Sequence, residues 1–410
     1  AWVVAVVVAG CWAAVVAFDA RLLPPVGSLT VEREMPDRLS VGVANKVALT
    51  VRNSSPRQAR LLVRETPPSG FAGQRLAGPV TVPAYGEARI ELAFVPPSRG
   101  AFDFGDVGIR ALGPLGAVFR QTVVPSAQRC AVYPDITAVR GYALLARRGK
   151  LQEIGVRAAR LAKAGTEFES LRDYQPGDPY RDIDWKATAR RGRPTVRQYE
   201  PERSQTLVIA IDAGRLMAAR SGILSKLDRA VNAALLLAYL GLEMGDHVGL
   251  LVFGRDVQSY LPPRKGRRHL SAVLDALYDV QARIEEPDYD RALRFLAQNL
   301  SRRSLVVLFT DVAGAEPSKR LLSVLGGLAP RHLALVATQR SRALEERVLA
   351  EVVRVEDAFA AAVAEDLLRD KAEALRSLTA RGVLVVDVEP ERLSVAAVNR
   401  YLEAKARGRL

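Results

Sequence analysis

The apolar positions of the chain fall into three successive patterns. Residues 1–18 form an uncharged and almost wholly apolar run. From about residue 26 to 135, short apolar and β-branched runs are separated by Pro, Gly, Asn and Ser, which is typical of strands joined by turns. After residue 204, continuous apolar runs of strand length alternate with stretches of helical periodicity. The patterns predict several structural units in series.

Residues 1–20 are predicted to form a transmembrane helix. Eighteen uncharged residues, at about 1.5 Å each, nearly cross a hydrocarbon core of about 30 Å. The run has neither the basic start nor the small-residue cleavage site of a signal peptide, and a buried core helix is the alternative. Because no Met opens the chain, we expect its N-terminus to be truncated. Arginine-rich sequence follows, which favours soluble domains on the cytoplasmic side of the cell membrane.

Residues 26–135 are predicted to form an all-β unit. Runs such as 46–52 and 88–95 have strand length and partly alternate, and about seven of them in this span indicate an immunoglobulin-like β-sandwich. The span lacks the Cys pair with an intervening Trp that antibody-type domains carry. Nothing in it indicates catalysis.

Residues 140–203 are predicted to be a charged connecting segment. Residues 140–200 hold fourteen Lys or Arg and eight Asp or Glu. A docking surface and a solvated charged loop are both open interpretations; contact with nucleic acid is weakened by the interleaved acids, which repel phosphates. We expect Tyr174, Trp185 and Tyr199 to pin the segment to a neighbouring core. The candidate interaction residues of the chain are Arg172, Tyr174, Gly177, Asp178, Arg181, Asp184, Trp185, Lys186, Arg190 and Arg215.

Residues 204–410 are predicted to be an α/β domain with a doubly wound, mostly parallel sheet. The expected strands are 206–211, 247–253, 257–261, 305–309, 333–337 and 383–388. The expected helices are 224–244, 268–280, 290–300, 318–328, 356–380 and 393–405. In the usual strand order, ligands bind beyond the carboxyl ends of the first and fourth strands. Asp212 and Asp311 stand at those ends, and two carboxylates there suit a divalent cation such as Mg²⁺.

Catalytic alternatives find little support. The residues after the first strand match neither the dinucleotide nor the phosphate-binding glycine loop, and no nucleophile with a base and an orienting acid is evident. We therefore expect a protein that is not an enzyme. The net charge of +14 keeps one other class open, an electrostatic binder of nucleic acid or of an anionic membrane surface.

The segment 165–200 resembles the signature of the bacterial domain-of-unknown-function family 58, and residues 206–390 resemble its von Willebrand factor A domain. In such domains a metal-ion-dependent adhesion site has the form DxSxS after the first strand. Here Gly214 and Leu216 replace both serines. The resemblance therefore implies a degenerate site in which only Asp212 and Asp311 match.

The degenerate site has further expected features. Residues 286–289, where the family has a Thr, supply none, although Asp288 or Asp290 could replace a ligand. We expect Asp212 to pair with Arg215 or to cap the following helix in preference to binding Mg²⁺. The resemblance implies a membrane-anchored adaptor or co-chaperone that works with a MoxR-type AAA ATPase on client proteins.

Overall fold

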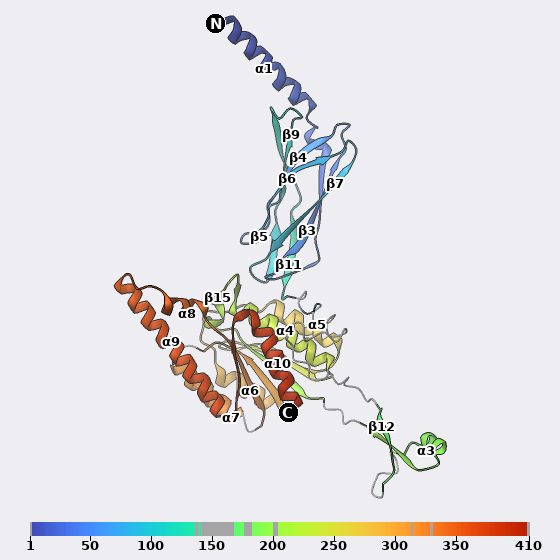
Figure 1. Ribbon diagram of the computed structural model, residues 1–410, viewed down its shortest axis with the longest axis vertical. Helices are drawn as coiled ribbons and strands as arrows, with labels where there is room; N and C mark the ends of the chain where they lie inside the picture. Colours follow the sequence, from blue (N-terminus) through green and yellow to red (C-terminus); the bar gives the residue numbers. More distant parts are fainter. Residues whose placement is uncertain are drawn as a thin grey trace. The chain divides into compact units, whose positions relative to one another are not determined.

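The protein is described here by a computed structural model that covers residues 2–135, 139, 141, 168–175, 183–199, 204–312, 315–328 and 331–407. The chain divides into two compact units, Ala1–Thr137 and Ala138–Leu410 (Figure 1). The first unit consists of an apolar helix and a β-sandwich-like region, and the second is mixed α/β.

Helix α1 (Trp2–Leu22) is the apolar run at the start of the chain. Of the described helices, it alone is long and apolar enough to cross a membrane, and only 6% of its apolar window is buried. That exposure argues against the alternative of a buried core helix. A membrane anchor and a signal sequence share this character.

The end of α1 is fastened to the sandwich-like region through Asp19. This side chain is fully buried, and its carboxylate accepts backbone N–H groups of Leu115 at 2.8 Å, Ala117 at 2.8 Å and Val118 at 3.0 Å. Gly113 leaves room for it, because a Cβ there would lie 2.2 Å from Asp19 Oδ2. The turn after β9 therefore serves as a socket for the helix end.

The sandwich-like region has eleven strands among its described residues, more than the seven or so predicted. They form sheets of order β1-β3-β7-β5, β10-β9-β4-β6 and β2-β11-β8. The extra strands include β2 and β5, which are too short to show an alternating pattern. The strands are β1 (Leu29–Glu34), β2 (Arg38–Ser40), β3 (Asn45–Asn53), β4 (Ala59–Arg64), β5 (Ala72–Gly73), β6 (Leu76–Val82), β7 (Glu87–Val95), β8 (Gly100–Phe104), β9 (Val107–Leu112), β10 (Phe119–Val124) and β11 (Gln128–Tyr133).

A short piece of the second unit folds around an antiparallel pair, β12 (Phe168–Asp173) and β13 (Thr195–Tyr199). Between them, α3 (Trp185–Arg191) is capped by Asp184, whose Oδ1 accepts the N–H of Ala187 at 3.0 Å. Trp185 was predicted to pin this segment to a core. Instead it is 68% exposed, because it opens a helix in which no residue is buried.

The centre of the second unit is a six-stranded sheet in the order β18-β17-β14-β19-β20-β21. All neighbours are parallel except the edge strand β18, which is antiparallel to β17. Numbered along the chain, the strands lie third, second, first, fourth, fifth and sixth. They are β14 (Thr206–Asp212), β17 (His247–Phe253), β18 (Val257–Arg264), β19 (Ser304–Phe309), β20 (Leu333–Gln339) and β21 (Leu384–Val388).

Helices cover both faces of this sheet. Ile209 and its alternate neighbours on β14 pack in one apolar cluster with α4, α5 and α10, while Val208 and Ala210 face a second cluster with α6, α7 and α9. Burial on both faces explains the continuous apolar runs of the strands. The helices are α4 (Lys226–Glu243), α5 (Arg267–Tyr278), α6 (Tyr289–Asn299), α7 (Ala315–Leu328), α8 (Arg342–Leu349), α9 (Val355–Ala380) and α10 (Leu393–Ala406); α8 was not predicted.

Candidate functional site

The two predicted acids meet at the carboxyl edge of the sheet. Asp212 ends β14, and Asp311 follows the adjacent parallel strand β19. Both are buried, with 1% and 6% of the residue exposed. The neighbouring strands therefore bring both carboxylates to the same edge of the sheet, at the point where the strand order reverses. We call this place, with Asp212 and Asp311, the crevice.

Asp212 is held by three hydrogen-bond donors. Its Oδ1 accepts the N–H of Gly214 at 2.7 Å. Its Oδ2 accepts the hydroxyls of Thr310 at 2.6 Å and Tyr289 at 3.1 Å. The expected pairing with Arg215 is wrong, because the Arg215 guanidinium points to Glu286 at 2.5 Å.

Asp311 is neutralised by two buried ammonium groups. Lys226 Nζ binds Asp311 Oδ2, and Lys371 Nζ lies 3.3 Å from Oδ1. Each lysine is 8% exposed. Oδ1 also accepts the Thr338 hydroxyl at 3.0 Å and a backbone N–H. We call Lys226, Lys371 and Asp311 the lysine–aspartate cluster.

These surroundings move the two carboxyl pKa values in opposite directions. Burial raises the pKa of Asp212 to about 6, against the lowering effect of its three hydrogen bonds and with a further rise from the charge of Asp311. Burial also acts on Asp311, but Lys371 and Lys226 outweigh it and lower the pKa of that carboxyl. Burial and the neighbouring Asp212 raise the pKa of Tyr289 well above its usual value.

The residues present do not fit a divalent cation. A cation at Asp311 would stand beside two ammonium groups in a buried setting, where like charges repel strongly. The oxygens of Asp212 are already occupied by hydrogen-bond donors, and the hydroxyls that would complete an oxygen shell are replaced by Gly214 and Leu216. Among the described residues, no group of three or more His, Cys, Asp or Glu is placed to hold a metal. Lys226 and Lys371 supply the positive charge beside Asp311 that a metal ion would supply.

A loop before α6 borders the crevice. Arg283 N donates to Ala213 O at 2.8 Å, and Arg215 N donates to Glu285 O at 2.9 Å. The loop approaches so closely that a Cβ on Gly214 would lie 2.8 Å from Pro287 Cδ. Ile284 stands out from it with 91% of its surface exposed. We call Ile284 and the Arg215–Glu286 ion pair the crevice rim.

The role of Asp288 also differs from the expectation. Its side chain accepts the N–H of Arg291 at 2.9 Å and caps α6. Asp290, in the first turn of α6, pairs with Arg294 at 3.5 Å. Neither acid takes the place of a missing ligand, because both are used by their own helix.

Sequence reasoning missed five residues that contact the two acids: Lys226, Tyr289, Thr310, Thr338 and Lys371. One signal was available for Lys371, because it shares the helical spacing of the buried residues Ala364, Ala374 and Leu378 on α9. A charged residue on such a stripe indicates a buried ion pair.

The remaining candidate interaction residues fall outside the crevice. Gly177, Asp178 and Arg181 lie outside the described residues. Tyr174 and Asp184 help to build the β12–α3–β13 piece, where the Tyr174 N–H donates to Pro194 O at 2.9 Å. Lys186 and Arg190 belong to α3, and Arg172 belongs to β12.

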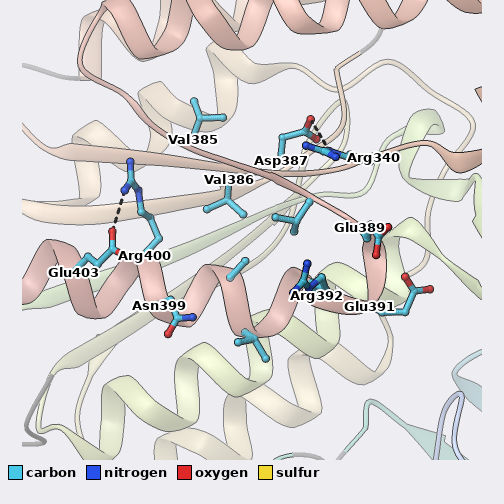
Figure 2. Close-up of a pocket in the computed structure, with 13 residues that line it drawn as sticks. Arg340, Val385, Val386, Asp387, Glu389, Glu391, Arg392, Asn399, Arg400 and Glu403 are labelled. Carbon is cyan, nitrogen blue, oxygen red and sulfur yellow. Dashed lines mark hydrogen bonds and ion pairs between the residues drawn. The ribbon is translucent and has the colours of Figure 1, made fainter. Parts of the chain in front are cut away.

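A second feature is a groove of about 860 Å³ between the edge strand β21 and α10 (Figure 2). Two ion pairs lie within its lining, Arg400–Glu403 at 2.9 Å and Arg340–Asp387 at 3.9 Å. Glu389 and Glu391 pair with Arg342, which lies outside the lining. The lining includes neither Asp212 nor Asp311. The groove is polar and of mixed charge, which gives no single ligand class.

Two curated relatives share more than half of the chain. An uncharacterized protein of Mycobacterium tuberculosis (strain ATCC 25618 / H37Rv) is 28% identical over 265 residues, which are 60% of this chain and 81% of the relative. Uncharacterized protein YeaD of Bacillus subtilis (strain 168) is 26% identical over 271 residues, 65% of this chain and 64% of the relative.

Solved structures resemble parts of the chain only distantly. The CARDB domain of PF1109 from Pyrococcus furiosus covers 26% of this chain and 94% of its own, at 17% identity and a TM-score of 0.18. Proximal thread matrix protein 1 from the mussel byssus covers 49% of this chain and 47% of its own, at 13% identity and a TM-score of 0.31. Neither supports a functional conclusion. Residues 170–387 match the family described as "Protein of unknown function DUF58", and the chain belongs to that family.

Proposed function

We propose that the chain is a membrane-anchored protein-interaction module without enzymatic activity, an adaptor or co-chaperone of a MoxR-type AAA ATPase. Helix α1 anchors it in the cell membrane, with the soluble units in the cytoplasm. The second unit acts as a von Willebrand factor A-like domain that presents the carboxyl edge of its sheet to the partner. The position of Asp212 and Asp311 after the first and fourth strands supports this assignment.

One observation carries the proposal. Both carboxylates already have partners from this chain: two lysines neutralise Asp311, and three hydrogen-bond donors hold Asp212. A general acid or base must exchange its proton with a substrate, whereas these carboxylates are buried and bonded. The crevice rim is exposed at this edge and consists of an apolar side chain beside an ion pair, which suits protein recognition.

The experiment measures capture of a purified MoxR-type ATPase by the full chain in detergent, with and without nucleotide. Ile284→Asp and Arg215→Glu should weaken capture about tenfold or more, because they change exposed rim residues. Val123→Asp, at an exposed position of β10, is the matched control. Equal capture by all variants would contradict a partner surface at the rim. Substitution of Asp212 is a poorer test, because this side chain is buried and offers no surface to a partner.

The electrostatic alternative makes a different prediction. If the +14 charge drives binding to nucleic acid or anionic vesicles, the affinity should fall steeply as salt rises. Binding of the ATPase through the rim should depend on salt much less, because one apolar side chain and one ion pair carry it. A salt titration with duplex DNA and with anionic vesicles separates the two classes.

A further inference from the structure

The helical hairpin of α8 and α9 extends beyond the carboxyl edge of the sheet. Lys371 marks the level of that edge, because its Nζ donates to Gln339 O at 2.5 Å and lies 3.3 Å from Asp311 Oδ1. Sixteen residues of α9 precede Lys371. At about 1.5 Å per residue they project roughly 24 Å past this level. Figure 1 shows α9 running out past the sheet.

The far end of this hairpin, residues 349–363, is apolar and uncovered; we call it the hairpin tip. No residue of α9 before Ala364 is buried. On α9, Val355, Phe359 and Val363 recur every fourth residue and so share one face. The exposed large apolar residues of the tip are Leu349 at 85%, Val352 at 56%, Val353 at 76%, Val355 at 70%, Phe359 at 70% and Val363 at 58%.

This apolar face does not serve the fold of the second unit. The buried side of α9 begins at Ala364 and continues through Lys371, Ala374 and Leu378, which pack toward the sheet. The two turns before it contribute nothing to that core. A cluster of large apolar side chains held out in water is costly unless another surface covers it.

The hairpin tip is preorganised. Arg347 on α8 reaches Asp357 on α9 at 3.1 Å, and the Arg354 N–H donates to the same carboxylate at 3.1 Å. These contacts fix the connection between the helices at the start of α9. A partner therefore meets a formed helix face and bears less of the cost of ordering it.

The charge around the tip selects the kind of partner. Residues 342–366 contain seven acidic and three basic residues, a net charge of −4 within a chain of +14. The acidic surroundings of the hairpin tip are repelled by anionic lipid headgroups and by phosphates. The hairpin tip and the acids around it suit an apolar groove that is bordered by Lys and Arg. The described groove of this chain beside β21 carries both charge signs, so a second copy offers no matching surface there.

We propose that the hairpin tip docks as a preformed helix face into an apolar groove bordered by basic residues on a protein partner. The inference rests on the proposed function, in which that partner is the ATPase, and it adds a second contact at the same end of the sheet as the crevice rim. Val355, Phe359 and Val363 are the anchors in a helix-in-groove mode.

The test measures the affinity of the purified ATPase for the full chain in detergent. The double variant Phe359→Asp, Val363→Asp should bind about tenfold or more weakly, because it places charges in the apolar contact. Glu356→Lys should weaken binding a few-fold and make the remaining binding less sensitive to salt. Glu373→Lys, on α9 beyond the tip and exposed, is the matched control and should bind as the wild type does. Hydrogen exchange of β14 and β19 should be unchanged in every variant.

The outcomes separate the two proposals. If the wild type binds the ATPase and the double variant binds equally well, the hairpin inference is overturned while the proposed function stands. If the wild type does not bind in any nucleotide state, both are overturned. Sedimentation of the wild type as a dimer that the double variant abolishes would assign the tip to a second copy, and tip-dependent binding to anionic vesicles would assign it to a membrane. Either result overturns the assignment of the hairpin tip to the ATPase.

Discussion

Replacing Asp212 by Asn should change how the stability of the second unit depends on pH. The amide keeps the shape of the carboxylate: its oxygen can accept the Gly214 N–H, and its nitrogen can donate to the hydroxyl oxygens of Thr310 and Tyr289. The substitution removes the titration of a buried group. The native unit therefore loses one source of pH dependence with little change in packing.

The magnitude follows from the pKa of Asp212, raised from the ordinary 3.8 to about 6. A raised carboxyl pKa means that the folded chain holds this proton more tightly than the unfolded chain. Its stabilising effect is complete below the unfolded value and is lost as pH rises through about 6. At about 1.4 kcal/mol per pKa unit, the total loss is about 3 kcal/mol, of which roughly half falls between pH 5 and 8.

The assay is urea unfolding of the full chain in detergent at several pH values. The readout is hydrogen exchange in peptides from β14 and β19. Reading these strands separates the second unit from the first. Between pH 5 and 8, the wild type should lose roughly 1–2 kcal/mol of unfolding free energy relative to Asp212→Asn. Asp290→Asn, at an exposed acid of α6, should run parallel to the wild type. If the unfolding free energy of Asp212→Asn also varies with pH in the same way as that of the wild type, the assignment of a raised pKa to the Asp212 carboxyl is refuted.

Two further predictions concern the buried charges of each unit. Lys226→Met should lower the unfolding free energy of the second unit by about 3 kcal/mol in the same assay, because Asp311 keeps only one ammonium partner. Lys265→Met, at an exposed lysine, is the control and should leave the unfolding free energy unchanged. Neither Mg²⁺ nor a chelator should shift the urea midpoint of the wild type. Asp19→Ala should speed hydrogen exchange at Leu115, Ala117 and Val118 by removing the acceptor of their N–H groups. Unchanged protection at these three residues would contradict the socket.

Local sequence was informative where burial imposes a regular pattern. The strands predicted at 206–211 and 247–253 are present as β14 and β17, because a parallel strand covered on both faces must be apolar at every position. Helix α8 was missed, since it has no buried residue and therefore no apolar stripe to detect.

The sequence alone could place Asp212 and Asp311 at strand ends, because Asp212 follows an apolar run directly and Asp311 follows one after a single Thr. Neighbouring parallel strands end at one edge of a sheet. The sequence could not identify the groups that neutralise the two acids. Lys226 and Lys371 reach Asp311 from α4 and α9, and Tyr289 reaches Asp212 from α6. These partners are far apart along the chain, and no local pattern encodes which helix packs beside which strand. Periodicity is set by neighbours in sequence, whereas the charge balance of a buried crevice is decided by residues that only tertiary packing brings together.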